Sequence, residues 1–137
     1  MPLFFYGTLM DPDVLDLVLG HSSGLREQSP GRLLGYRRVY VRGEIYPTLI
    51  EAGPEDTVIG TIYWPRSADD IAKLNTFEGS DYFATQLDVM NPVGDHIVAW
   101  VYRSGADIRP TQEDWALSEW RELHKARFLA EYPGWYR

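Results

Sequence analysis

The 137-residue chain contains no cysteine. It therefore has no disulfide, no thiolate nucleophile and no cysteine-based metal site. Histidine is scarce as well, and His21, His96 and His124 show neither the i, i+4 spacing of a helical metal pair nor a dense group of carboxylates beside them. The G-x-S-x-G, P-loop and G-x-G-x-x-G motifs are missing too. We expect no metal site and no cofactor.

Long apolar stretches are also absent. No segment approaches the about 20 apolar residues that a helix needs to cross a bilayer. The first ten residues, MPLFFYGTLM, contain no basic leader followed by a long apolar stretch. The sequence therefore predicts a cytoplasmic protein with no membrane partner.

Positive charge is the minority charge. Lys and Arg number 13 against 20 Asp and Glu, which gives a formal net charge of -7 at pH 7. The resulting field opposes binding to a polyanion. The basic residues of the segment 31–43 alternate along a predicted strand beside two tyrosines, which is typical of a solvated sheet face with arginine stems packed on aromatic rings. They are Arg32, Arg37, Arg38 and Arg42. We expect no nucleic-acid partner.

What is present indicates an ordered α+β domain. Hydrophobic residues make up 45% of the chain and charged residues 24%, as in average globular proteins. A chain of this length suits one domain, here residues 1–137, and buries roughly two thirds of its extended surface on folding. Apolar patterns and turn residues predict strands at 2–6, 32–42, 44–50, 58–64, 83–90 and 96–102.

Three helices are predicted between these strands and after them. Asp11 and Pro12 begin the first helix and Gly20 ends it, with Val14, Leu15 and Val18 on its apolar face. The second helix begins at Ser67, buries Ile71, Leu74 and Phe77, and stops at Gly79. The third begins at a capping box of Thr111 and Asp114 and ends at Tyr132-Pro133-Gly134.

Glu78 is the carboxylate with the most unusual position. It follows Phe77 and precedes the glycine that stops the second helix. The negative end of the helix dipole and an apolar surround would both disfavour its charged form and raise its pKa. A raised pKa makes a carboxyl group a better general acid and base near neutrality. The alternative is a solvated residue at a helix end, and the neighbouring Tyr82 has a similar alternative as a half-buried strand aromatic.

The loop YGTL at residues 6–9 offers complementary chemistry. Gly7 lets the backbone turn sharply after the first strand, and the amides that follow can point at an anion such as a carboxylate. The same arrangement of strand, glycine, threonine and helix also occurs as an ordinary connection, in which Asp11 caps the helix. Together, an anion-binding loop and an unusual carboxylate would form a site for a small zwitterion.

Four short motifs occur in an order that resembles one family. They are F-Y-G-T-L at the N-terminus, Y-P-T-L at 46–49, V-x-G-x-x-Y at 58–63 and L-x-x-F-E-G-x-x-Y at 74–82. Together they resemble the gamma-glutamylcyclotransferase-like family across most of the chain. The resemblance implies an α+β fold built on a small mixed, mainly antiparallel β-barrel flanked by helices.

The resemblance also implies roles for particular residues. By motif position, Tyr6, Gly7, Thr8 and Leu9 hold the glutamyl end of the substrate, Tyr82 contributes to substrate binding and Glu78 is the catalytic acid and base. One position departs from the family pattern. Members often have Arg or Lys two residues after the tyrosine of the last motif, whereas this chain has Ala84.

The implied function is a cofactor-independent enzyme, of the acyltransferase or cyclising lyase type. It would release 5-oxoproline and an amine or amino acid from a small gamma-glutamyl substrate. A non-catalytic domain that holds a small acid or a peptide end is the alternative. An interaction protein is a third possibility, because aromatic residues gather near the C-terminus: Trp115, Trp120, Tyr132, Trp135 and Tyr136. The sequence leaves the departing amine open, and we expect a monomer or a weak homodimer.

Overall fold

A closed barrel of five strands forms the centre of the computed structural model, which describes residues 1–23 and 27–132. The strands follow the order β1-β5-β2-β6-β7, and β1 closes the barrel by pairing in parallel with β7, while the other neighbours are antiparallel. The bounds are β1 Leu3–Phe5, β2 Gln28–Leu34, β5 Thr57–Tyr63, β6 Tyr82–Met90 and β7 His96–Ser104. The predicted α+β fold with a mixed, mainly antiparallel barrel is confirmed.

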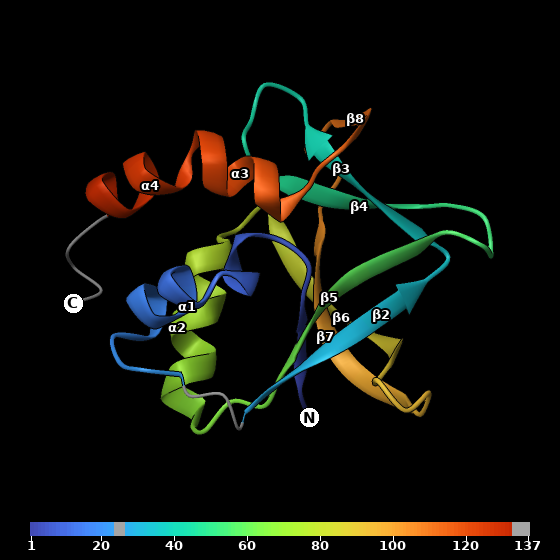
Figure 1. Cartoon of the computed structure of the whole chain (residues 1–137), viewed down its shortest axis with the longest axis horizontal. Helices are drawn as coiled ribbons and strands as arrows, with labels where there is room; N and C mark the ends of the chain where they lie inside the picture. The colour runs from blue at the N-terminus through green and yellow to red at the C-terminus, as the bar shows by residue number, and fades with distance from the viewer. Residues whose placement is uncertain (24–26, 133–137) are drawn as a thin grey trace.

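A three-stranded sheet and a set of helices surround the barrel (Figure 1). The sheet has the order β4-β3-β8, with β3 Tyr36–Val41, β4 Pro47–Glu51 and β8 Pro110–Asp114. Helices α1 and α2 pack side by side, and α3 and α4 follow β8. The helices are η1 Thr8–Met10, α1 Pro12–Leu19, α2 Ala68–Glu78, α3 Leu117–Leu123 and α4 Lys125–Glu131. Among the described residues, none of these helices has the length and apolar character needed to cross a membrane.

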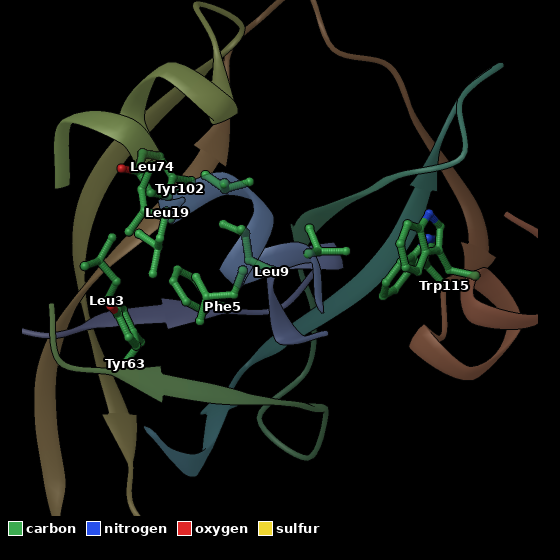
Figure 2. Packing of buried hydrophobic residues seen from close by; sticks show 12 residues of the cluster. Leu3, Phe5, Leu9, Leu19, Tyr63, Leu74, Tyr102 and Trp115 are labelled. Carbon is green, nitrogen blue, oxygen red and sulfur yellow. The ribbon is translucent and has the colours of Figure 1, made fainter. Parts of the chain in front are cut away.

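The first strand separates two hydrophobic cores. Side chains alternate across a strand, so Leu3 and Phe5 pack among the helices while Phe4 and Tyr6 pack inside the barrel. Figure 2 shows the helical core, in which Leu3 and Phe5 lie close to Leu19 of α1 and Leu74 of α2. The end of β1 therefore lies where both cores meet, and the loop that follows it has firm support.

The first two helices begin and end at the predicted residues. The Asp11 carboxylate accepts the amides of Asp13 and Val14 at the start of α1, and Gly20 ends that helix with a φ of 78°. Ser67 caps α2. The predicted buried face of α2 is wrong at one position, because Ile71 is 39% exposed while Asp70 is 3% exposed. Asp70 faces inward because its carboxylate binds the imidazole of His21 at 2.8 Å.

The predicted strand at 32–42 is two strands. Gly35 breaks it with a φ of 84°, so that β2 pairs with β5 in the barrel and β3 joins the other sheet. β2 also begins at Gln28, four residues before the predicted strand at 32–42. Pro47 begins β4 at the edge of its sheet, where its missing amide costs no ladder hydrogen bond.

The predicted capping box at Thr111 is wrong. Residues 110–114 form β8, which pairs with β3, and the Thr111 hydroxyl donates to the Tyr40 carbonyl at 2.9 Å. The helix begins at Leu117 and is interrupted at His124, which separates α3 from α4. Trp115 and Trp120 are fully buried core residues, while the predicted aromatic residues Trp135 and Tyr136 lie outside the described part of the chain.

Candidate active site

The six predicted site residues line one cavity of about 460 Å³. The loop after β1 supplies Tyr6, Gly7, Thr8 and Leu9, and the segment from the end of α2 to the start of β6 supplies Glu78 and Tyr82. These two segments are about 70 residues apart in the sequence and meet because β1 and β7 close the barrel and β6 pairs with β7. The remaining walls include residues 44–47 at and before the start of β4, Tyr102 of β7, and Trp120 and Phe128 of the C-terminal helices.

The C-terminal helices are held against α1 by a buried carboxylate. Besides capping α1, Asp11 accepts a hydrogen bond from Arg121 at 2.7 Å and lies 3.0 Å from the Lys125 ammonium. Burial alone would raise the pKa of Asp11, but these cations lower it below its ordinary value. The contacts bring Trp120 and Phe128 to the wall of the cavity.

Glu78 presents an unpaired carboxyl group to this cavity. It is the last residue of α2, which ends because Gly79 takes a φ of 79°. The side chain is half-buried, and no hydrogen bond or ion pair from the described residues reaches its oxygens. Desolvation by the surrounding protein raises its pKa from 4.5 to about 7. The predicted rise is confirmed, and the group can both accept and return a proton near neutral pH.

Neutral tyrosines surround this carboxyl group. The Tyr6 hydroxyl donates to the Tyr102 carbonyl at 2.6 Å, the Tyr82 hydroxyl donates to the Pro47 carbonyl at 3.1 Å and the Tyr102 hydroxyl donates to Asn75. Burial, followed by the nearby charge of Glu78, raises the pKa of Tyr6, Tyr82 and Tyr102. All three therefore stay protonated, so they add no competing base beside Glu78.

The loop opposite Glu78 offers backbone donors. After β1, the chain turns at Gly7, where an added Cβ would lie 3.3 Å from Pro47 Cγ, and continues into η1. Within the described part of the chain, no backbone or side-chain acceptor receives the amides of Gly7, Thr8 and Leu9. Gly7, Thr8 and Leu9 all line the cavity, and a run of successive amides without acceptors favours an anion.

The charged side chains that line the cavity are all acidic. They are Glu44, Glu78 and Asp81, and no Lys or Arg of the described residues joins them at the wall. Sequence reasoning missed Glu44, Asp81 and Tyr102, because the two acids belong to turns and the tyrosine to an ordinary strand. Ala84, at the position where the family often has a basic residue, is exposed and does not line the cavity.

Within residues 1–23 and 27–132, no three His, Asp or Glu side chains gather in a way that could hold a metal ion. The polar groups that line the cavity include carboxyl groups, phenols, the Thr8 hydroxyl and the Trp120 indole.

Comparison with known families gives a clear match. The protein-family model described as gamma-glutamyl cyclotransferase, AIG2-like, matches residues 3–122, a range that contains all six predicted site residues. The chain belongs to this family. The AIG2-like match confirms the resemblance that the four sequence motifs indicate.

Named relatives and solved structures are similar to this AIG2-like chain at low identity. AIG2-like protein A of Arabidopsis thaliana is 24% identical over 135 residues, covering 95% of this chain and 78% of the relative. AIG2-like protein D of the same plant is 26% identical over 133 residues, covering 93% and 83%. A solution structure of an Arabidopsis thaliana protein has a TM-score of 0.69 at 23% identity, covering 94% of this chain and 85% of that one.

A structure named gamma-glutamyl cyclotransferase has a TM-score of 0.60 at 14% identity and covers 80% of this chain and 69% of its own. At such identities the structural likeness establishes the fold. A fold of this kind does not by itself determine the activity, which depends on the residues of the cavity.

Proposed function

We propose that this protein is a gamma-glutamyl cyclotransferase that converts a gamma-glutamyl substrate into 5-oxoproline and a free amine or amino acid. One observation carries the proposal. The unpaired carboxyl group of Glu78, whose pKa is raised to about 7, shares a cavity with three backbone amides that have no acceptor among the described residues. A base and an anion-binding wall are what a zwitterionic gamma-glutamyl group requires.

The proposed reaction needs one proton carrier. Glu78 takes a proton from the α-ammonium of the substrate, and the freed amine attacks the γ-carbonyl carbon to close a five-membered ring. As protonated Glu78 gives this proton to the departing nitrogen, the bond from the γ-carbonyl carbon to that nitrogen breaks. The Glu78 carboxylate then takes the second proton from the ring nitrogen and passes it to the departing amine, which leaves as an ammonium. The lactam nitrogen keeps one proton, the charges balance, and Glu78 ends as the carboxylate with which it began.

The nucleophile is part of the substrate, so the protein mainly has to hold a folded conformer. Orientation of tethered reactants can contribute several kcal/mol to such a step. The amides of Gly7, Thr8 and Leu9 would hold either the α-carboxylate or the oxyanion that develops on the γ-carbonyl oxygen. Tyr6 and Tyr82 pack beside this position as neutral residues.

A non-catalytic binding domain is the second candidate. The three free amides alone would hold a small carboxylate, whether or not Glu78 transfers a proton. The two functions differ in one property: a binder needs no titrating group at position 78, whereas a cyclotransferase loses turnover when that group cannot carry a proton.

The test is release of 5-oxoproline from a panel of gamma-glutamyl dipeptides, gamma-glutamyl amines and gamma-glutamyl-ε-lysine. Wild type is compared with Glu78→Gln and with Glu55→Gln, a control that removes an exposed carboxylate from the turn between β4 and β5. General acid-base catalysis contributes about 100-fold to 10,000-fold, so we expect a loss of at least about 100-fold in Glu78→Gln and none in the control.

The other outcomes separate the candidates. Equal release by wild type and a folded Glu78→Gln would remove Glu78 from the mechanism. No release from any member of the panel, together with binding of 5-oxoproline, would favour the binding domain. The substrate that is cleaved best would identify the departing amine. A single domain over residues 1–137, a cytoplasmic location and a monomeric or weakly dimeric state stay predictions.

A further inference from the structure

Arg38 lies directly behind the cavity loop. Its Nη1 donates to the carbonyls of Tyr6 at 3.0 Å and Ile59 at 2.9 Å, and its Nε donates to the Trp115 carbonyl at 3.0 Å. The guanidinium also stacks on the Trp115 ring, with Cζ 5.5 Å from the ring centroid. The predicted solvated sheet face, with stems on tyrosines, is therefore wrong for this arginine, which is partly buried against backbone oxygens and an indole.

The charge of Arg38 has no carboxylate partner among the described residues. The neighbouring Asp114 pairs with Arg37 at 2.8 Å and affects Arg38 only through its field. Desolvation lowers the pKa of Arg38, but a guanidinium stays protonated in proteins. A partly buried cation that is held by carbonyls and an indole ring, with no carboxylate, is unusual, because such charges are ordinarily paired. No carboxylate of the described residues neutralises this positive charge, so it can polarise the carbonyl groups that Arg38 binds.

The bond to Tyr6 connects this charge to the cavity. In a trans peptide the carbonyl and the following amide point in opposite directions, and the described residues contain no cis peptide. Arg38 therefore binds one side of the Tyr6–Gly7 peptide group while the Gly7 amide leaves from the other side. Hydrogen bonds in series polarise one another, so a cation on the carbonyl makes the amide a stronger donor.

The same guanidinium fixes the walls around the loop. Ile59 belongs to β5, on the barrel, and Trp115 immediately precedes the N-cap residue of α3, the helix that brings Trp120 to the cavity. Met10, at the end of η1, also contacts Nη1 through its sulfur at 3.9 Å. Arg38 thus connects the loop, the barrel and the C-terminal helices at one point.

We propose that Arg38 is a positioning residue for anion binding: it orients the Tyr6–Gly7 peptide and, through that peptide, strengthens the Gly7 amide as a donor to a carboxylate in the cavity. The inference rests on the proposed function in taking the carboxylate to be that of a gamma-glutamyl group. It predicts that removing Arg38 weakens ligands that carry a carboxylate and spares ligands that lack one.

Two probes separate this role from a purely structural one. 5-Oxoproline and 2-pyrrolidinone share the lactam ring, but only the former carries a carboxylate. Their dissociation constants are measured by NMR titration for wild type, Arg38→Met, Arg38→Lys and Arg37→Met, which removes a cation from the adjacent position on β3. Thermal unfolding establishes that each variant is folded.

Losing a well-oriented hydrogen bond between the Gly7 amide and a ligand carboxylate would lower affinity by about 10-fold or more. We therefore expect Arg38→Met to weaken 5-oxoproline by about that factor and to leave 2-pyrrolidinone within about twofold. Arg38→Lys keeps the charge and should recover part of the loss, and Arg37→Met should match wild type. Equal weakening of both probes in Arg38→Met would overturn the inference, as would no weakening at all.

A second measurement needs only the wild-type protein. The Gly7 amide proton should shift downfield when 5-oxoproline is added and stay in place with 2-pyrrolidinone. If Arg38→Met does not fold, this response and the Arg38→Lys affinities decide the question, and an unmoved Gly7 amide with bound 5-oxoproline overturns the inference. Catalytic silence with an intact Gly7 response would reject the cyclotransferase alone, whereas a wild type that binds no carboxylate would reject both.

Discussion

The chemistry of the cavity depends first on single carboxyl groups and what surrounds them. Glu78 stands at the end of α2 with Phe77 before it, and Phe77 packs against Phe128 and Tyr132. Such a surround disfavours the ionised carboxylate because it replaces water with apolar atoms. Burial of the Glu78 carboxyl group therefore lowers the stability of the fold, and it also produces a group that can exchange protons near neutral pH.

This cost should appear as a pH dependence of stability. The folded-state pKa of Glu78 is about 7 against 4.5 when unperturbed, so the unfolded chain releases this proton first as pH rises. Wild type should therefore lose stability relative to Glu78→Gln between about pH 4.5 and pH 7, and the difference should level off above that window. Urea unfolding of both proteins from pH 4 to pH 9 measures it.

The control Glu55→Gln, which removes an exposed carboxylate in a turn, tests whether the loss of a carboxylate elsewhere produces the same change. A difference between wild type and Glu78→Gln that does not vary with pH would mean that position 78 is solvated in the folded protein.

The other two acids at the cavity wall should influence the departing amine. The charged side chains at the wall, among them Glu44 and Asp81, are all acidic. They would repel a carboxylate on the departing group. Under the proposed function, Glu44→Gln with Asp81→Asn should raise kcat/KM for a gamma-glutamyl amino acid relative to a neutral gamma-glutamyl amine by about 3-fold to 10-fold. An unchanged ratio would show that the departing group lies outside the cavity.

At the scale of elements, α1 and α2 are joined by a polar contact as well as by apolar packing. His21, just after α1, binds Asp70 in the first turn of α2 at 2.8 Å, and the Lys73 ammonium donates to the Leu19 carbonyl at 2.7 Å. These contacts hold the helix that carries Glu78 against the rest of the helical layer.

The His21 contact should weaken as pH rises. The hydrogen bond to Asp70 raises the pKa of His21, while Lys73 opposes the rise. For a histidine with a raised folded-state pKa, the added stability is fully present below the unfolded value of about 6.5 and disappears as pH passes the folded value. The stability difference between wild type and His21→Gln should therefore shrink as pH rises from about 6.5 through the raised folded-state value, as measured by urea unfolding. A difference that grows with pH would contradict this interpretation.

At the scale of the whole molecule, the pairing of β1 with β5 in the barrel leaves no room for a side chain at Gly60. An added Cβ on Gly60 of β5 would lie 2.3 Å from the Phe5 carbonyl oxygen and 2.6 Å from the Phe4 ring. β1 pairs with β5 beside this glycine directly before it enters the cavity loop, so the β1–β5 pairing and the placement of Gly7 depend on the same contact.

Gly60→Ala should therefore destabilise the protein and disturb the cavity together. Overpacking of this kind costs about 1–3 kcal/mol, and more where backbone blocks the added atom. Gly53→Ala is the matched control, because there the nearest atom to an added Cβ is a side-chain oxygen of Asp56 at 3.4 Å. Denaturant unfolding measures both, and a Gly60→Ala protein as stable as the control would mean that the strands can separate without loss.

Local signals in the sequence were sufficient for much of this protein. The caps of α1 and α2 depend on residues within one helical turn, so Asp11, Gly20 and Ser67 could be recognised without the rest of the chain. The short motifs around Gly7 and Glu78 likewise predicted the family and the two segments that the fold brings to one cavity.

The tertiary structure decided what depends on distant partners. Thr111 belongs to a strand because β8 pairs with β3 and the Thr111 hydroxyl donates to the Tyr40 carbonyl. Gly35 divides one predicted strand because the two halves belong to different sheets. Glu44 and Asp81 line the cavity only because their turns run past it. Arg38 lies partly buried, and not on a solvated face, because it donates hydrogen bonds to three carbonyls. Strand pairing and charge placement are set by contacts between segments far apart in the chain, and no local pattern encodes them.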